Sequence, residues 1–245
     1  MKAIILAAGK GKRASVPFPK VLQRLGGRYV IDYVVENALQ FVDEADTYIV
    51  VGYQRHQVER YLGGAFHYVV QEELLGTGHA VLQTYPFLRD FDGDLLILNG
   101  DSPLFRAESL RRLIDRHRTE EAELTILTGV TNDPLPYGRI VRDPSGRIID
   151  IIEDADAHGE IREIDELNAG AYLVRADRLF PALHKLDRDN AQGEYLLTDT
   201  VRALIRSGCR VEGVSTFDPD ELLGVNTEED LIQAERIVRK RGLGE

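Results

Sequence analysis

Short apolar runs alternate with helix-like segments along the first half of the chain, and this alternation restricts the fold more than any other feature. The strand-like runs are residues 3–6, 47–51, 66–70, 95–98 and 124–130. The helical candidates between them are residues 30–41, 57–62, 78–84 and 107–117. Apolar strands that are separated by helices are typical of a parallel sheet covered on both faces. The sequence therefore predicts an α/β fold.

The pattern changes after residue 131. Residues 139–142 and 147–153 flank an Asp-Pro-Ser-Gly turn and predict an antiparallel hairpin. Further strand and helix candidates are residues 168–174, 176–183, 198–207 and 227–239. Thr227 and Asp230 form a capping-box pattern at the start of the last helix. We expect one domain over residues 1–245, in which a mixed, mainly parallel sheet carries a small antiparallel insertion.

Charge is unevenly distributed along the chain, and its distribution limits the partners. Lys and Arg number 30 against 41 Asp and Glu, yet seven basic residues precede the first acidic residue, Asp32. An acidic chain with one short basic segment lacks the extended positive face that DNA and RNA require, so we expect no nucleic-acid partner. No apolar run approaches the roughly 20 residues that cross a bilayer, so we expect no membrane partner and a cytoplasmic location. A single cysteine, Cys209, excludes an internal disulfide.

A small, basic loop follows the first strand at Leu6-Ala7-Ala8-Gly9-Lys10-Gly11-Lys12-Arg13. Small residues allow backbone N–H groups to approach a ligand closely, and the three cations of the loop attract phosphate groups. The loop is not a dinucleotide-binding fingerprint, because Ala14 stands at the third glycine position, and it is not a P-loop. On its own it fits either a phosphate-binding loop or an ordinary strand-to-helix turn.

Lys20 stands in a stiffened segment, Pro17-Phe18-Pro19-Lys20-Val21-Leu22. A lysine on a rigid backbone can be directed at a phosphoryl group where charge develops in a transition state. Residues 6–13 followed by Pro19-Lys20-Val21-Leu22 resemble the signature of sugar-1-phosphate nucleotidyltransferases. The Ala-Ala-Gly form is similar to the uridylyltransferase domains of bacterial bifunctional N-acetylglucosamine-1-phosphate uridylyltransferases. The fold that this resemblance implies is a Rossmann-like sheet with helices on both faces.

Later segments resemble the same family in the same order. They are Gln71 with residues 75–80, Gly100-Asp101-Ser102-Pro103-Leu104, Tyr137-Gly138-Arg139-Ile140, Glu153, Asn168 with Gly170, residues 190–199, and Gly224-Val225-Asn226. The resemblance implies a nucleotide-binding part at about 1–131 and 197–226. It also implies a sugar-binding insertion at about 132–196, before a C-terminal helix at 227–241.

The resemblance also assigns site residues. Those assigned to the nucleotide are Leu6, Ala7, Ala8, Gly9, Gly11, Lys12, Arg13, Gln71, Gly76 and Thr77. Those assigned to the sugar are Gly138, Glu153 and Asn168. Arg13 and Lys20 are the expected catalytic residues: Arg13 would hold the departing pyrophosphate and Lys20 the phosphate charge near the reacting centre.

Asp101 and Asn226 are the expected metal ligands. Asp101 follows an apolar strand, at the end of a sheet strand where open α/β folds bind ligands. One carboxylate and one amide oxygen suit Mg²⁺, which takes its remaining ligands from water and substrate phosphates. Without the resemblance, Asp101 would be interpreted as a turn former and Asn226 as a helix N-cap.

The implied reaction joins an NTP and a sugar-1-phosphate to give an NDP-sugar and pyrophosphate, with UTP and N-acetylglucosamine-1-phosphate as the expected pair. Three departures from the family pattern bear on substrate choice, namely Lys12, Asn99 and Ala169. Another NTP (GTP, dTTP or CTP) or a cyclitol phosphate therefore stays open, as does a non-catalytic sensor of nucleotide sugars. No hexapeptide repeat occurs in these residues, so acetyl transfer is not predicted.

Overall fold

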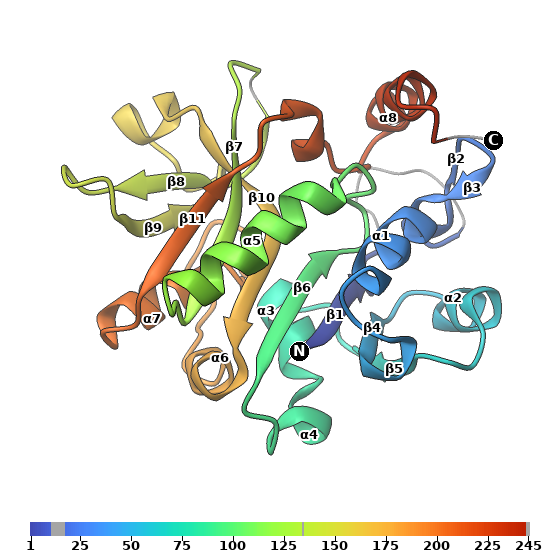
Figure 1. Cartoon of the computed structure of the whole chain (residues 1–245), viewed down its shortest axis with the longest axis horizontal. Coiled ribbons are helices and arrows are strands. Elements are labelled where there is room, and N and C mark those ends of the chain that lie inside the picture. The colour runs from blue at the N-terminus through green and yellow to red at the C-terminus, as the bar shows by residue number, and fades with distance from the viewer. Residues whose placement is uncertain (11–17, 134, 244–245) are drawn as a thin grey trace.

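The described part of the computed structural model, residues 1–10, 18–133 and 135–243, contains a nine-stranded mixed sheet (Figure 1). Its main path runs in the order β11-β7-β10-β6-β1-β4-β5. The bounds of these strands, in chain order, are β1 Lys2–Ala7, β4 Thr47–Val51, β5 His67–Val70, β6 Asp94–Asn99, β7 Leu124–Val130, β10 Glu166–Arg175 and β11 Val211–Ser215. This arrangement confirms the mixed, mainly parallel sheet that the sequence predicts.

β1 lies between β4 and β6 and is parallel to both, with Ile4 opposite Tyr48 on one side and Ile97 on the other. The chain therefore leaves β1 in one direction to build β4 and β5, and returns to the opposite side of β1 to add β6. Such a reversal of strand order opens a crevice at the carboxyl ends of the strands, where α/β sheets bind ligands.

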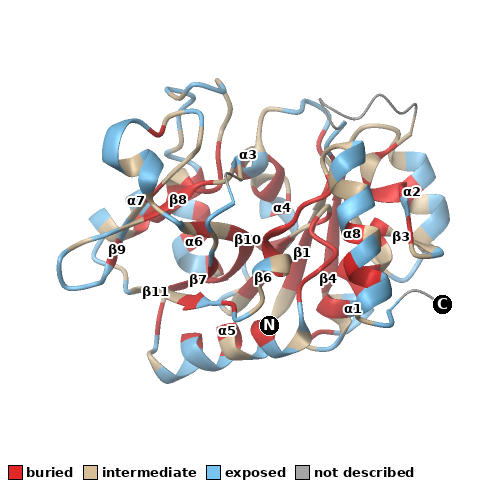
Figure 2. Ribbon diagram, turned by 90° about the horizontal axis from the view of Figure 1, so that it is seen from above, coloured by how far each residue is buried: buried red, intermediate tan, exposed pale blue. Residues whose placement is uncertain are grey.

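Helices cover both faces of the sheet, and the strands between them are buried (Figure 2). One face carries α1 (Val30–Leu39), α2 (Arg55–Leu62) and α5 (Ala107–Thr119). The other carries α3 (Thr77–Leu82), α4 (Tyr85–Leu88), α6 (Ala176–Leu183) and α7 (Asp199–Arg206). Apolar side chains on each helix fill the core against the strands, which accounts for the helical spacing in the sequence.

The antiparallel hairpin lies at one end of the sheet. It consists of β8 (Arg139–Arg142) and β9 (Ile148–Ile152), and β8 also pairs with β10 at Leu167 opposite Arg139. β10 falls inside the range 132–196 but runs antiparallel between β6 and β7 in the main sheet. That range therefore supplies both a peripheral hairpin and a central strand, and the division of the chain into two parts stays a prediction.

Short elements complete the structure near the end of the chain. β2 (Arg24–Leu25) and β3 (Arg28–Tyr29) form a small antiparallel pair, and α8 (Glu228–Lys240) packs near it (Figure 1). The predicted capping box of α8 is confirmed, because the Thr227 side chain accepts from the backbone N–H of Asp230 and the Asp230 carboxylate accepts from Thr227. The remaining elements are the 3₁₀ turns η1 Lys20–Leu22, η2 Glu44–Asp46, η3 Gly159–Glu163 and η4 Pro219–Leu222.

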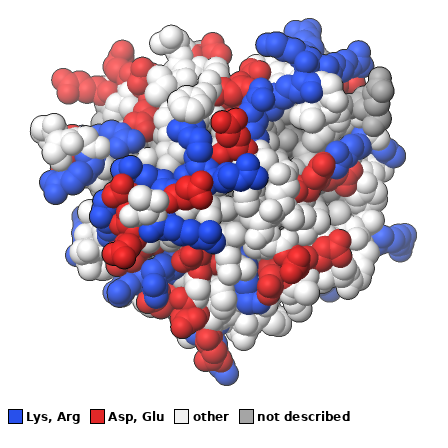
Figure 3. Space-filling model, viewed as in Figure 1, with Lys and Arg blue, Asp and Glu red and all other residues white. Residues whose placement is uncertain are grey.

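Basic and acidic side chains are interspersed on the face shown in Figure 3. Many of them pair across elements, as Arg116 does with Glu212 at 2.8 Å and Arg106 does with Asp218 at 2.5 Å. In the ranges that the structure describes, every helix is too short or too polar to traverse a lipid bilayer.

Candidate functional site

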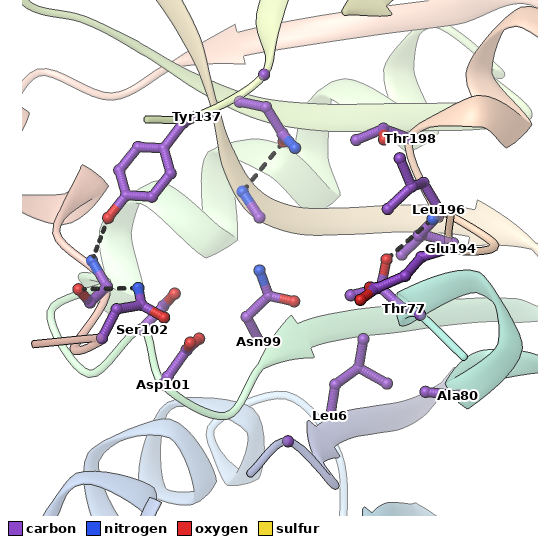
Figure 4. Close-up of a pocket in the computed structure, with 18 of the residues that line it drawn as sticks. Leu6, Thr77, Ala80, Asn99, Asp101, Ser102, Tyr137, Glu194, Leu196 and Thr198 are labelled. Carbon is purple, nitrogen blue, oxygen red and sulfur yellow. Dashed lines mark hydrogen bonds between the residues drawn. The ribbon is translucent and has the colours of Figure 1, made fainter. Parts of the chain in front are cut away.

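A cleft of about 470 Å³ opens at the carboxyl ends of β1 and β6, at the reversal of strand order (Figure 4). Asp101 and Tyr137 line one side of it, Thr77 and Thr198 line the other, and Asn99 points into the space between them. Every described residue that the sequence assigns to a site lies in the lining of this cleft, except Ala7, which ends β1 beside it. Residues from position 6 to position 226 thus meet at one place.

Three of these residues form a charged cluster. The Lys20 ammonium donates to a carboxylate oxygen of Asp101 and, at 3.1 Å, to the amide oxygen of Asn226. The side chains of Lys20 and Asp101 retain only 15% and 16% of their exposure, so the pair is largely shielded from water. Lys20 is separated from Asp101 by 81 positions and from Asn226 by 206, and the fold brings all three together.

Backbone hydrogen bonds fix the segments that carry the cluster. Lys20 is the first residue of η1, and the other two residues of this turn, Val21 and Leu22, are buried in the core. Asp101 follows β6, and its backbone carbonyl accepts a hydrogen bond from the Val225 N–H at 2.7 Å. This bond joins the loop of Asp101 to the loop of Asn226. The Asn226 amide nitrogen donates to the Gly224 carbonyl at 3.3 Å, so its oxygen faces Lys20.

The turn between β6 and Asp101 requires a glycine. Gly100 donates its N–H to the Leu6 carbonyl at 3.0 Å, and a Cβ atom at this position would lie 2.7 Å from that same oxygen. Since the close neighbour is backbone, a larger residue would force β1 and β6 apart at the cleft.

The donor set suits a magnesium ion. Asp101 and Asn226 offer one charged and one neutral oxygen to a common cation, which in this structure is the Lys20 ammonium. Among the described residues, no group of three or more acidic, histidine or cysteine side chains gathers around a point. A metal held here would therefore complete its coordination with water and substrate phosphates, as Mg²⁺ commonly does.

Gln71 lies at the opposite end of the cleft and is almost fully buried. Its amide nitrogen donates to the Gly76 carbonyl at 3.0 Å and lies 3.0 Å from the His79 ring. Burial lowers the pKa of His79, so its neutral ring is favoured in this contact. The amide nitrogen of Gln71 thus holds the turn before α3, while no described residue donates a hydrogen bond to its carbonyl oxygen.

The turn before α3 is closed by a distant segment of the chain. The Thr77 hydroxyl accepts from the Leu197 N–H at 3.0 Å, and the Gly78 N–H donates to the Tyr195 carbonyl at 2.8 Å. Tyr195 in turn donates its N–H to the Leu75 carbonyl at 2.8 Å. Residues 194–197, which we call the strap, therefore lie directly on the turn that carries Gly76 and Thr77.

Glu153 lies just after β9, on the side of the cleft that the sequence assigns to the sugar. The Thr198 hydroxyl donates to one of its carboxylate oxygens at 2.7 Å. Burial raises the pKa of the Glu153 carboxyl above its ordinary value, although the bond from Thr198 opposes this shift. Gly138 lies beside it, where a Cβ atom would be 3.7 Å from the carboxylate.

Asn168 differs from expectation in how its amide is used. The nitrogen donates to the Tyr172 hydroxyl at 2.6 Å, and the oxygen accepts from the Gly170 N–H at 3.1 Å. These bonds span a register shift in β10, where Gly170 has a φ of +82°. Asn168 thus stabilises a β-bulge next to the cleft, a common position for bulges.

Tyr137 and Tyr172 contribute more to the site than their motifs suggest. The Tyr137 hydroxyl accepts from the Gly224 N–H at 2.9 Å and so links the region before β8 to the loop that carries Asn226. Tyr172 stands four positions after Asn168 in a predicted strand, and this spacing places both side chains on one face. The spacing was the available signal for the contact between them. Gly11, Lys12 and Arg13 lie outside the described residues, so their predicted roles stay predictions.

A mixed sheet with a cleft of ligand size at its switch point, lined by a lysine and a paired carboxylate, is typical of an α/β domain that binds a phosphorylated small molecule. The model of the MobA-like NTP transferase domain matches residues 3–210. The chain therefore belongs to the family of MobA-like NTP transferase domains, and it is a nucleotidyltransferase domain.

Curated relatives agree with this family. The bifunctional protein GlmU of Levilactobacillus brevis is 44% identical over 238 residues, which are 97% of this chain and 52% of the relative. GlmU of Caldanaerobacter subterraneus subsp. tengcongensis is 41% identical over 239 residues, 98% of this chain and 52% of the relative. The chain thus spans about half the length of the curated relatives that it matches.

Solved structures share the fold at low sequence identity. A Bacillus anthracis chain provisionally assigned as a glucose-1-phosphate thymidylyltransferase superposes with a TM-score of 0.80 at 21% identity, covering 97% of this chain and 95% of that one. A UDP-glucose pyrophosphorylase complexed with UDP-glucose gives 0.77 at 19% identity, covering 98% of both chains.

Proposed function

We propose that this domain transfers a nucleotidyl group from an NTP to a sugar-1-phosphate, and that UTP and N-acetylglucosamine-1-phosphate are its preferred pair. The observation that carries the proposal is the convergence of Lys20, Asp101 and Asn226 in the cleft. Identity above 40% to GlmU over nearly the whole chain supports the choice of substrates. The cytoplasmic location predicted from the sequence belongs to the same proposal.

The reaction needs positioning and charge stabilisation more than covalent chemistry. A sugar phosphate oxygen attacks the α-phosphorus of the nucleotide, a new P–O bond forms, and the bond to the departing pyrophosphate breaks. The attacking oxygen is already anionic, so no general base is required. The Lys20 ammonium holds negative charge near the reacting phosphorus, and Arg13 holds the pyrophosphate.

Magnesium fits this scheme through the oxygens of Asp101 and Asn226. When bound, it supplies charge neutralisation between the nucleotide and sugar phosphates. The Val225 N–H bond to the Asp101 carbonyl keeps the two ligand-bearing loops at a fixed separation.

Different residues of the cleft recognise the base and the sugar. The carbonyl of Gln71 and the backbone near Gly76 and Thr77 receive the base. Glu153 accepts a hydrogen bond from a sugar hydroxyl, and Gly138 lies beside Glu153 in the lining. Asn168 acts here by shaping β10 through its bond to Tyr172.

Pyrophosphate release tests the proposal. The protein and Mg²⁺ are incubated with UTP, GTP, dTTP or CTP, each combined with a panel of sugar-1-phosphates and cyclitol phosphates. We expect the highest kcat/KM with UTP and N-acetylglucosamine-1-phosphate. No release with any pair contradicts catalysis and favours a sensor of nucleotide sugars.

Replacing Lys20 tests the observation that carries the proposal. Lys20→Ala should lower kcat by at least about a hundredfold, the scale seen when one group that stabilises transition-state charge is removed. Lys2→Ala is the matched control, because Lys2 also pairs with an aspartate, Asp46, but lies outside the cleft. Near-normal turnover of Lys20→Ala would remove Lys20 from the mechanism.

A further inference from the structure

The Lys20 ammonium occupies the point on which both proposed metal ligands converge. It donates to Asp101 and Asn226 together, although a lysine needs only one anionic partner to be stabilised. A metal coordinated by both oxygens at about 2.1 Å would lie against this ammonium. The two cations therefore compete for one position.

Charge favours the lysine in the ligand-free protein. Asp101 carries one negative charge, which Lys20 neutralises in a site that is largely shielded from water. A divalent ion in the same place would leave an excess of positive charge beside a displaced ammonium, and such repulsion is strong at short range in a shielded site. Nucleotide and sugar phosphates remove this excess, because they give Lys20 new anionic partners.

The backbone around Lys20 allows this exchange without refolding. η1 is fixed by the bond from the Leu22 N–H to the Pro19 carbonyl at 2.9 Å and by the burial of Val21 and Leu22. The lysine stem runs beside Gly9, where even an added Cβ atom would lie 3.6 Å from the Lys20 Cε, an ordinary contact distance. Only the side chain has to turn, from Asp101 toward the cleft.

We infer that Lys20 is an internal counter-ion that keeps metal out of the site until phosphates arrive. The inference rests on the proposed metal position between Asp101 and Asn226. Its consequence is strong positive coupling: the nucleotide raises the affinity for metal by drawing the ammonium away. By linkage, metal raises the affinity for nucleotide by the same factor.

Direct metal binding to the nucleotide-free protein tests this inference. Mn²⁺ is titrated into the wild-type chain and into Lys20→Met, and bound ion is measured by the loss of the free-Mn²⁺ electron paramagnetic resonance signal. Lys20→Met should bind Mn²⁺ at least about tenfold more tightly than wild type, because one repelling charge has been removed. Lys2→Met, which leaves Asp46 without its lysine, controls for the change in net charge and should bind like wild type.

Two further variants keep the test decisive. The double variant Lys20→Met/Asp101→Asn should lose the added affinity for Mn²⁺, because the ion that Lys20→Met binds is coordinated by Asp101. If Lys20→Met does not fold, Lys20→Gln takes its place. Equal or weaker binding by Lys20→Met, no saturable binding by it, or added affinity that survives Asp101→Asn would each overturn the inference. The measurement involves no turnover, so a failure here is distinct from a failure to release pyrophosphate.

Discussion

At the scale of single residues, the cleft contains polar groups in two different states. Some are fully engaged within the protein, as Asn168 is by Tyr172 and Gly170. Glu153 has a protein donor on only one carboxylate oxygen in the described structure, which leaves the other for a ligand. A buried acceptor kept for a ligand lowers stability in its absence, because burying charge without full compensation is unfavourable.

Glu153→Gln is expected to separate this stability effect from function. The folded protein holds the Glu153 proton to higher pH than the unfolded chain does, because burial raises this pKa. The contribution of Glu153 to the free energy of unfolding therefore falls as the pH rises from the ordinary pKa of 4.5 through the raised one. The glutamine variant lacks that fall, so at pH 7.5 it should be at least as stable as wild type.

The KM of Glu153→Gln for the sugar phosphate should nevertheless rise about tenfold or more, because the charged hydrogen-bond acceptor has been lost. Urea unfolding at pH 4.5 and 7.5, with steady-state kinetics, measures both effects. The exposed Glu160→Gln is the control on the same part of the chain. A glutamine variant with unchanged KM would mean that Glu153 does not touch the sugar.

The residues of the charged cluster show how far the sequence alone can lead. Lys20, Asp101 and Asn226 were predicted through motif resemblance and the strand that precedes Asp101. Their contact depends on folding across more than 200 positions, which no local pattern encodes. The internal use of the Asn168 amide was missed, because its only signals in the sequence are Gly170 and the spacing to Tyr172, and neither specifies a bulge.

At the scale of elements, apolar runs predicted the buried strands and helices well. β7 and α6 coincide with the predicted ranges, since each is bounded by polar residues. β11 was missed because its sequence, Val-Glu-Gly-Val-Ser, interrupts the apolar run. Pairing with β7 and burial of Val214 in the core stabilise it. β2 and β3 have two residues each and give no periodicity to detect.

Among the contacts between elements, the one between the turn before α3 and the strap should be the most sensitive to substitution. Gly76 has a φ of +117°, and a Cβ atom there would lie 2.4 Å from the Tyr195 carbonyl oxygen. Gly76→Ala should displace the strap, lower the free energy of unfolding by about 2 kcal/mol or more and raise the KM for the NTP. Thermal unfolding and steady-state kinetics measure these effects.

Gly63→Ala distinguishes displacement of the strap from simple backbone strain. Gly63 also has a positive φ, +87°, but no atom lies within 4 Å of its added Cβ. Its substitution should cost about 1–3 kcal/mol through backbone strain alone and, unlike Gly76→Ala, leave the KM for the NTP unchanged. If the two variants behave alike, strain rather than contact with Tyr195 explains the loss.

At the scale of the whole molecule, α8 supports the site from outside the sheet. Its buried residues Ala234, Ile237 and Val238 pack in one cluster with Leu223 and Val225. These two residues flank Gly224 and precede Asn226, so α8 packs behind the loop that carries Asn226. The sequence predicted α8 as a helix but gave no indication of what it packs against, because one apolar face fits many surfaces.

Val238→Ala tests whether packing of α8 stabilises the loop that carries Asn226. Val238 is fully buried, and loss of two methyl groups should lower the free energy of unfolding by about 1–3 kcal/mol. A loosened loop should also raise the Mg²⁺ concentration that gives half-maximal pyrophosphate release. Ile232→Ala is the control, because Ile232 is 46% exposed on the same helix. An altered stability with unchanged Mg²⁺ dependence would show that α8 does not influence the loop.

The hairpin β8–β9 joins the main sheet through one register pair, Leu167 opposite Arg139, and through the ion pair of Arg142 with Glu166 of β10. Its other face packs against α7, where Asp150 pairs with Arg202. Apolar packing tolerates simultaneous substitutions when the total volume and the apolar pattern are kept. The hairpin and α7 can therefore diverge together while β1, β4 and β6 keep their register. Under the proposed function, exchanging the hairpin and α7 for those of a relative would change which sugar phosphate is accepted and leave the strands beside the nucleotide unaltered.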